Sequence, residues 1–202
     1  VLGLGRSGMA AATCLGVAGA IVYLADDQQQ PPHIPAGSTL ADWQDWPWDQ
    51  LDLMVISPGI PHLYPAPHPA ASMARDHGVE IVSEIEIAMR AAPSARIVTV
   101  TGTNGKSTAT ALIGHCLTAA GRAVMVVGNI GDAGCGLDDP GADGVIVVEL
   151  SAYQLESTPS LRSDVAILRN ITPDHLDRHN GMDGYVAAKT RIFDGLSADG
   201  IA

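Results

Sequence analysis

The chain has 202 residues, of which 47% are hydrophobic and only 4% aromatic, and its formal net charge is −11. The acidic balance argues against nucleic-acid binding, which requires a basic face. No apolar run approaches the roughly 18 residues of a membrane-spanning helix, so we expect neither a membrane span nor a signal peptide.

The first predicted unit opens on a glycine-rich turn. Residues 3–8, Gly-Leu-Gly-Arg-Ser-Gly, have the spacing of a dinucleotide-binding fingerprint. A helix is predicted over 9–17, and a strand over 20–24 ends at the acidic pair 26–27. An acidic residue about 20 positions after the glycines is placed to bond a ribose. The alternative is a glycine turn that serves only close packing.

The first unit continues with a loop predicted over 42–50 and a buried strand over 53–56. This strand ends in Ser57-Pro58-Gly59, either an ordinary turn or a ligand contact, because doubly wound folds bind ligands at the carboxyl ends of strands. Further elements are expected along the chain up to a linker at Pro93: a helix over 69–77, a strand over 79–82 and a helix over 84–92.

The second unit contains the most informative segment, residues 101–108, Thr-Gly-Thr-Asn-Gly-Lys-Ser-Thr. It follows a β-branched strand over 97–100 and begins a helix predicted to end near Gly121. Backbone N–H groups in such a turn cradle phosphate, with Lys106 reaching the β/γ-phosphates and the Ser107 hydroxyl on Mg²⁺. The turn is shorter than the standard P-loop, and the alternative is a glycine turn with a surface lysine.

Three more strands are predicted, over 123–127, 144–148 and 164–168. Glu149 ends the second of them, where an acid can hold Mg²⁺, although a solvated strand-end acid is the alternative. Three side chains after the last strand are possible metal or phosphate contacts, whereas His179 is expected to face solvent: Asp174, His175 and Asp177. A helix over 183–196 would by itself place Lys189 and Arg191 on a solvated face.

These elements predict an α/β protein with a Rossmann-like N-terminal domain, residues 1–93, and an incomplete P-loop ATPase-type parallel-sheet domain, residues 94–202. The three cysteines lack metal-site spacing and are typical of reduced core thiols in a cytoplasmic protein: Cys14, Cys116 and Cys135. Because the chain starts without Met and stops where another strand could begin, we expect a fragment.

All 202 residues resemble the Mur ligases, ATP-dependent amide-bond ligases of peptidoglycan precursor synthesis. The family motif Thr-Gly-Thr-Asn-Gly-Lys-Ser stands at 101–107. Four other segments resemble the branch of the family that adds D-glutamate to UDP-N-acetylmuramoyl-L-alanine: Gly-Asn-Ile-Gly at 128–131, Glu-Leu-Ser-Ala-Tyr-Gln-Leu-Glu at 149–156, Asp-His-Leu-Asp-Arg-His at 174–179 and Ala-Lys-Thr-Arg-Ile at 188–192.

The resemblance implies the following site residues. ATP would lie on Gly102, Thr103, Asn104, Gly105, Lys106, Ser107 and Thr108. Two Mg²⁺ ions would be held by Ser107, Glu149, His175 and Lys189, the last as a CO₂ carbamate. Catalytic roles would fall to Lys106, His175 and Lys189. The first glycine loop would hold the UDP of the substrate rather than NAD, with substrate contacts from Gly5, Arg6, Ser7, Asp26, Asp27, Ser57, Pro58, Gly59, Asn129 and His175.

The implied reaction forms an acyl phosphate from ATP and the carboxylate of UDP-N-acetylmuramoyl-L-alanine, which the amine of D-glutamate then attacks. The resemblance further implies a monomeric cytoplasmic enzyme. The family's C-terminal amino-acid-binding domain is absent from these 202 residues, so we expect the fragment alone to be inactive. Two alternatives are another Mur or folylpolyglutamate-type ligase, and a non-catalytic nicotinamide- or nucleotide-binding module with Asp26 on a ribose.

Overall fold

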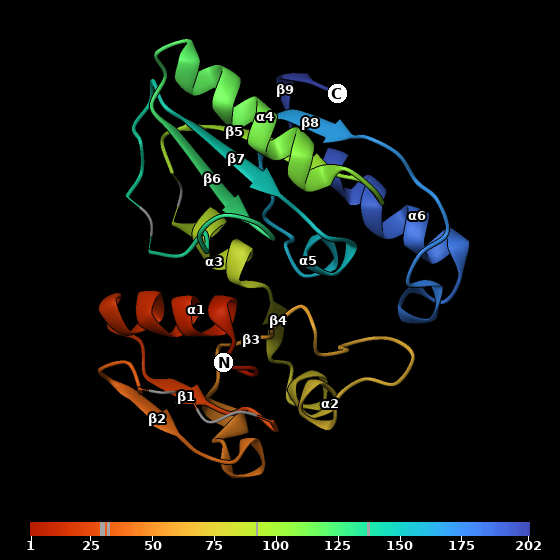
Figure 1. Cartoon of the computed structure of the whole chain (residues 1–202). Helices are drawn as coiled ribbons and strands as arrows, with labels where there is room; N and C mark the ends of the chain where they lie inside the picture. The colour runs from red at the N-terminus through yellow and green to blue at the C-terminus, as the bar shows by residue number, and fades with distance from the viewer. Residues whose placement is uncertain (29–30, 32, 92, 137) are drawn as a thin grey trace.

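Figure 1 presents the computed structural model of the chain, which describes residues 1–28, 31, 33–91, 93–136 and 138–202. Two α/β units lie one above the other, with α1 (Arg6–Val17) and α3 (Glu84–Arg90) between them. Every strand pairing is parallel among the described residues. The predicted α/β fold is confirmed, and its buried strands rich in Val and Ile are the kind that parallel sheets require.

The first unit is built on two short parallel strand pairs. The chain start joins them, because Leu2 bridges both Ala25 and Ile56. The resulting order is β2, β1, residues 1–3, β3, β4. The elements after α1 are β1 (Val22–Leu24), β2 (Ser38–Leu40), β3 (Leu53–Val55), α2 (Pro69–Asp76) and β4 (Glu80–Val82).

The second unit is a five-stranded sheet in the order β6-β7-β5-β8-β9. Its elements are β5 (Arg96–Thr101), α4 (Lys106–Ala119), β6 (Val124–Gly128), β7 (Val145–Glu149), α5 (Ala152–Glu156), β8 (Ser163–Leu168), α6 (Met182–Thr190) and β9 (Leu196–Ile201). Helix α4 crosses one face of the sheet (Figure 1). Because the strands of this sheet are parallel, their carboxyl ends meet at one edge, where the loops that follow them converge.

Helix α3 belongs to both hydrophobic cores. Ile85 packs with Ile97 and Val148 of the upper sheet, whereas Ile87 packs with Val55 and Val82 of the lower one. One short helix thus connects the packing of the two units.

Several predicted elements change in the structure. The expected loop over 42–50 contains two 3₁₀ turns, Trp43–Asp45 and Trp48–Gln50, because the Asp42 carboxylate accepts the N–H of Gln44 and Trp48 is buried. Strand β2 and helix α5 were not predicted. The helix predicted over 84–92 is described up to Arg90, and residue 92 lies outside the described residues.

The helix predicted over 183–196 is wrong at its end. Helix α6 stops at Thr190, a 3₁₀ turn covers Arg191–Phe193, and Leu196 already belongs to β9. A Cβ on Gly195 would lie 1.5 Å from the carbonyl oxygen of Leu161, so the chain passes too close to its neighbour for a continuing helix of ordinary residues. Pairing of β9 with β8 replaces the helix.

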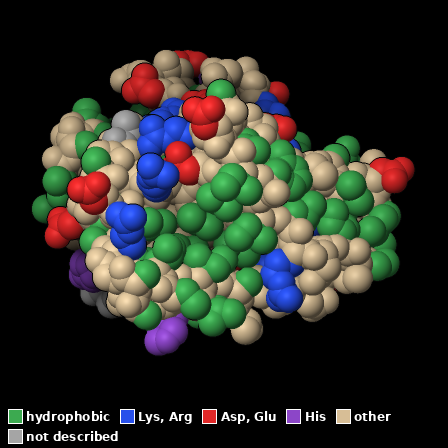
Figure 2. Space-filling model, turned by 90° about the horizontal axis from the view of Figure 1, so that it is seen from above, with side chains coloured by type: hydrophobic (Ala, Val, Ile, Leu, Met, Phe, Trp, Pro, Cys, Tyr) green, Lys and Arg blue, Asp and Glu red, His purple; other side chains and the backbone are tan. Residues whose placement is uncertain are grey.

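The surface and the cysteines add three observations. Seen from above, hydrophobic side chains fill the centre of one face, and Lys and Arg groups lie among Asp and Glu (Figure 2). Within the described ranges, no helix combines the length and apolarity needed to cross a bilayer. Cys135 is buried but Cys116 is exposed, so the expectation of three core thiols is wrong at Cys116.

Candidate active site

The predicted phosphate loop connects β5 to α4. Gly105, with φ of +74°, precedes the first helical residue, Lys106, and a Cβ on it would lie 1.7 Å from Nη1 of Arg169. The Lys106 ammonium folds back to donate to the carbonyl oxygen of Thr103 at 3.0 Å. The first-turn N–H groups of α4, at Lys106, Ser107 and Thr108, have no acceptor within the helix, which makes this turn suited to an anion.

Two residues that the sequence analysis did not identify shape this loop. The side-chain oxygen of Asn170 accepts the N–H groups of Thr103 at 3.1 Å and Asn104 at 3.0 Å. The Tyr185 hydroxyl lies 3.1 Å from the hydroxyl of Thr103. Tyr185 precedes Lys189 by one helical turn, a spacing that places both on the same face of α6 and could have identified it.

Glu149 ends β7 beside the loop and is fully buried. Its Oε1 accepts the Ser107 hydroxyl at 3.2 Å and the Asn129 amide at 3.3 Å. Its Oε2 is buried and has no hydrogen-bond partner among the described residues. A buried carboxylate oxygen without a partner is costly, so this atom fits a cation ligand next to the phosphate loop.

Lys189 is 2% exposed, so the expectation of a solvated face is wrong. Its ammonium donates to the carbonyl oxygen of Gly102 at 2.8 Å and lies 4.8 Å from the centre of the Tyr185 ring. Burial, and then the charge of Lys106, lower the pKa of Lys189 to about 8. Helix α6 presents the face that carries Lys189 to the phosphate loop. The spacing of residues along the helix could not by itself predict that this face is buried.

The two histidines after β8 have opposite environments. His175 is exposed and its ring centre lies 5.5 Å from that of Tyr153. His179, expected to face solvent, is instead 2% exposed, with Nδ1 2.8 Å from the Glu156 carboxylate. It is buried because the Tyr153 ring stacks on it at 5.2 Å and the Tyr185 ring lies 5.3 Å away.

A cleft of about 300 Å³ brings together predicted residues from both units. It is lined by Pro58, Gly59, Lys106, Asn129, Ser151, Ala152, Tyr153, Asp174, His175, Tyr185 and Lys189. Ser151 caps α5 through a capping box with Gln154, which fixes the wall that carries Tyr153. Arg178 reaches from the upper unit to the lower one and donates to the carbonyl oxygen of Gly59 at 3.3 Å.

The glycine loop of the first unit lies outside this cleft. A Cβ on Gly8 would lie 1.9 Å from the carbonyl oxygen of Gly3, so the third glycine permits close packing of α1 on the sheet. The Ser57 hydroxyl donates to the same oxygen at 3.0 Å. Asp26 accepts the N–H of Leu4 at 2.6 Å and thereby supports the loop.

A second cavity of about 300 Å³ lies beside that loop and is lined by Asp26, Asp27, Leu40 and Trp43 among others. Asp27 also pairs with His68 at 2.7 Å. The predicted substrate residues therefore lie at different places in the structure. The acidic pair lies at this cavity, Pro58, Gly59, Asn129 and His175 lie at the cleft, and Gly5, Arg6 and Ser7 start α1.

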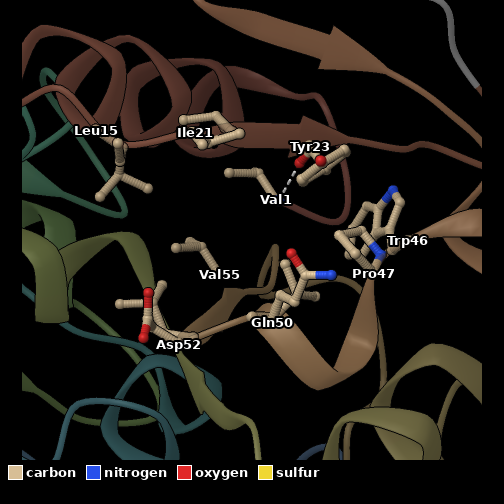
Figure 3. A pocket seen from close by; sticks show the side chains of 13 residues that line it. Val1, Leu15, Ile21, Tyr23, Trp46, Pro47, Gln50, Asp52 and Val55 are labelled. Carbon is tan, nitrogen blue, oxygen red and sulfur yellow. Dashed lines mark hydrogen bonds between the residues drawn. The ribbon is translucent and has the colours of Figure 1, made fainter.

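A third cavity, of about 370 Å³, contains none of the predicted residues. Figure 3 shows Leu15, Ile21, Val55 and other side chains around Val1, whose ammonium donates to the carbonyl oxygen of Tyr23 at 2.6 Å. It lies at the amino ends of β1 and β3. Parallel α/β sheets bind ligands at the opposite, carboxyl ends, so we do not place the chemistry here.

Metal ligands are few around the cleft. Within the part of the chain that the structure describes, no three His, Cys, Asp or Glu side chains form a metal-binding group. Glu149 and Ser107 offer neighbouring oxygens, a set that suits Mg²⁺, which keeps waters and phosphate oxygens as its other ligands.

The chain is similar in sequence to known proteins. The sequence profile of the Mur ligase middle domain matches residues 100–202. The UDP-N-acetylmuramoylalanine–D-glutamate ligase of Paramagnetospirillum magneticum is 49% identical over 204 residues, an alignment that covers 100% of this chain and 45% of that protein. The enzyme of the same name from Rhodospirillum rubrum is 47% identical, over 96% of this chain and 42% of that protein.

Two solved structures share the fold. The UDP-N-acetylmuramate:L-alanyl-gamma-D-glutamyl-meso-diaminopimelate ligase of Neisseria meningitides has a TM-score of 0.63 at 19% identity, covering 99% of this chain and 68% of that one. The murein peptide ligase of Psychrobacter arcticus has a TM-score of 0.55 at 20% identity, covering 99% of this chain and 47% of that one.

The chain therefore spans less than half the length of the curated relatives it matches. The matched profile covers just over half of the chain, from the end of β5 through the phosphate loop to β9. On these grounds the chain belongs to the Mur ligase family.

Proposed function

We propose that this chain supplies the substrate- and ATP-binding parts of a ligase that adds D-glutamate to UDP-N-acetylmuramoyl-L-alanine in peptidoglycan precursor synthesis. Residues 1–93 would form the UDP-substrate domain and residues 94–202 the central ATP domain. The observation that carries the proposal is the cleft at the strand ends, where Lys106, Asn129 and Lys189 face Pro58 and Gly59 of the other unit. The names of the 49% and 47% identical relatives support the same reaction.

The phosphates of ATP would lie on the turn from Gly102 to Thr108. The substrate carboxylate attacks the γ-phosphorus, ADP leaves, and an acyl phosphate results. The amine of D-glutamate then attacks the acyl carbon, releasing phosphate and a proton. Negative charge spreads over the transferring phosphoryl oxygens, so Lys106 and the first-turn N–H groups of α4 would stabilise the transition state.

The residues present fit Mg²⁺ at one end of the cleft. Glu149, through the Oε2 that has no hydrogen-bond partner in the described part of the chain, and Ser107 would hold one ion. His175 and a carbamate on Lys189 would hold a second. When bound, Mg²⁺ would neutralise part of the phosphate charge. Asn129, hydrogen-bonded to Glu149, would contact the substrate near its reacting carboxylate.

Carbamylation of Lys189 requires a neutral amine, and lowering its pKa to about 8 makes the neutral fraction near neutral pH larger than that of an ordinary lysine. The nitrogen lone pair would attack CO₂, and the lost proton would pass to solvent, leaving an anionic carbamate. We expect a carbamate signal by ¹³C NMR with labelled bicarbonate, and no such signal in Lys189→Ala. A signal that persists in Lys189→Ala, or none in the unchanged chain, would contradict this role.

The UDP of the substrate would lie at the start of α1. Gly5 faces open space, because a Cβ added to it would meet no heavy atom within 4 Å, and this leaves room for a diphosphate. The N–H groups of Arg6 and Ser7 are in the first turn of α1 and can bind its oxygens. Asp26 and Asp27 line the neighbouring cavity, which would take the uridine, and Ser57 would support the loop.

Calorimetric titration of residues 1–202 with UDP-N-acetylmuramoyl-L-alanine, UDP and NADH, each separately, tests this proposal. We expect both uridine compounds to bind and NADH not to bind. Binding of NADH without UDP would instead support a nicotinamide-binding module. A further titration with Mg²⁺ and a non-hydrolysable ATP analogue should show a second, separate site.

A further inference from the structure

The loop after β6 leaves the upper sheet and approaches the lower unit. Gly128 and Gly131 have φ of +105° and +71°, and a Cβ on either would lie within 2.3 Å of backbone oxygen, of Glu149 and Val126 respectively. The N–H of Asn129 donates to the carbonyl oxygen of Glu149 at 3.0 Å, and its side-chain amide donates to the Glu149 carboxylate at 3.3 Å. This tight turn therefore fixes where Asn129 enters the cleft.

The carbonyl groups of the same turn converge on one side chain of the lower unit. Arg6 donates from Nη1 to Gly131 at 2.7 Å and from Nη2 to Gly128 and Asn129 at 3.2 Å each. Arg6 is the first residue of α1. The planar fork of arginine directs its donors to several carbonyl oxygens at once, whereas a lysine ammonium carries its three donors on a flexible stem.

The other end of the loop is anchored independently. Cys135 is 6% exposed and packs in the hydrophobic core of the lower unit, with Leu4 and Val55. Its N–H donates to the buried carboxylate of Glu84, and its thiol donates to the Glu84 carbonyl oxygen at 3.2 Å. Residues 128–135 thus start on the upper sheet and end in the lower core, so the segment mechanically links the two units.

We propose that Arg6 is a positioning residue that couples the two binding sites: its guanidinium holds residues 128–131, and with them Asn129, against the start of α1. A diphosphate bound by the N–H groups of that helix start would order the same turn. This inference rests on the proposed function only for the identity of the ligands. It adds to the expected substrate contact of Arg6: the side chain would hold the loop, while the backbone N–H would bind the diphosphate.

The test is amide hydrogen exchange of residues 1–202, followed by NMR at Gly128 and Asn129, whose N–H groups donate to Asp132 and Glu149. The variants are Arg6→Leu and Arg6→Lys, with Arg122→Leu, an exposed arginine in the turn after α4, as the matched control. Each is measured free and with saturating UDP. Circular dichroism and the exchange of β5 amides report whether the fold is kept.

Without ligand, we expect Arg6→Leu to speed exchange at both amides about tenfold, the effect of losing roughly 1.4 kcal/mol of local stability, and Arg6→Lys to give an intermediate rate. Arg122→Leu should match the unchanged chain. UDP should slow exchange at Asn129 in the unchanged chain and not in Arg6→Leu. Unchanged loop exchange in Arg6→Leu would overturn the proposal, and weakened UDP binding with an unchanged loop would assign the guanidinium to the diphosphate instead.

The two proposals fail in different ways. If the unchanged chain does not bind UDP, the proposed substrate is wrong, and the proposed coupling between the two binding sites is wrong as well. The ligand-free exchange rates still decide whether Arg6 positions the loop. If UDP binds and slows the loop equally in all variants, the function stands and the role of Arg6 is wrong. Should Arg6→Leu not fold, the comparison of Arg6→Lys with the unchanged chain decides.

Discussion

At the scale of single residues, Glu149 offers the sharpest test of the phosphate site. Glu149→Gln keeps an oxygen for Ser107 and Asn129 but removes the negative charge of the carboxylate, whose Oε2 is buried without a partner among the residues that the structure describes. A lost charged interaction costs about 1.5–3 kcal/mol, so Mg²⁺–ATP affinity should fall at least about tenfold. Calorimetry of Mg²⁺–ATP and UDP on the same variant measures this. Equal loss of UDP affinity would show that the effect is not local.

Lys106 should govern nucleotide affinity through its charge. Lys106→Met keeps the length of the side chain but removes the ammonium at the start of α4. ATP should bind about ten- to a hundredfold more weakly, whereas AMP, which lacks the β- and γ-phosphates, should bind equally to both chains. A parallel loss for both nucleotides would indicate damage to the loop rather than to a phosphate contact.

The buried Lys189 should make stability depend on pH. Its pKa is lowered from 10.5 to about 8 in the folded chain. Between these values the unfolded chain holds a proton that the folded chain has lost, so the free energy of unfolding should rise with pH across the window. Urea unfolding in CO₂-free buffer measures the slope, and Lys189→Met should flatten it. An equal slope in both chains would show that other groups control it.

At the scale of elements, substitutions at two glycines at the start of α1 should affect folding stability and UDP binding differently. Gly8→Ala places a Cβ 1.9 Å from the carbonyl oxygen of Gly3, whereas Gly5→Ala meets nothing within 4 Å. Overpacking typically costs about 1–3 kcal/mol, so Gly8→Ala should lower the urea midpoint clearly more than Gly5→Ala. Gly5→Ala should mainly weaken UDP binding, because its methyl group occupies the space left for the diphosphate. Similar midpoints for both variants would refute this packing role.

At the scale of the whole molecule, the two units should unfold together. Helix α3 packs in both cores, Ser83 bonds Thr158 across the units at 2.7 Å, and Ser160 donates to Glu86 at 2.9 Å. All three tryptophans, at 43, 46 and 48, lie in the lower unit and report it by fluorescence, while far-ultraviolet circular dichroism reports both. We expect coincident thermal transitions. Two separated transitions would mean that the interface between the two units contributes little to the free energy of unfolding.

Much of the architecture follows from local sequence. The β-branched runs of β5, β7 and β8 can be recognised in the sequence because buried strands require such residues. The glycines before α1 and α4 can be recognised because tight turns require them. The prediction for Glu149 has the same basis: it directly follows an apolar run, and such ends meet at the ligand edge of a parallel sheet. The phosphate loop is predicted from its own eight residues.

The sequence by itself therefore determined the α/β class and the family resemblance and predicted the phosphate turn, since each depends on residues close together in the chain. Only the tertiary structure decided which side chains are removed from water. Lys189 and His179 look like surface residues in sequence, yet the phosphate loop and Tyr153 bury them. Arg6 likewise meets a turn 122 residues later, a contact that depends on how two sheets pack and that no local pattern encodes.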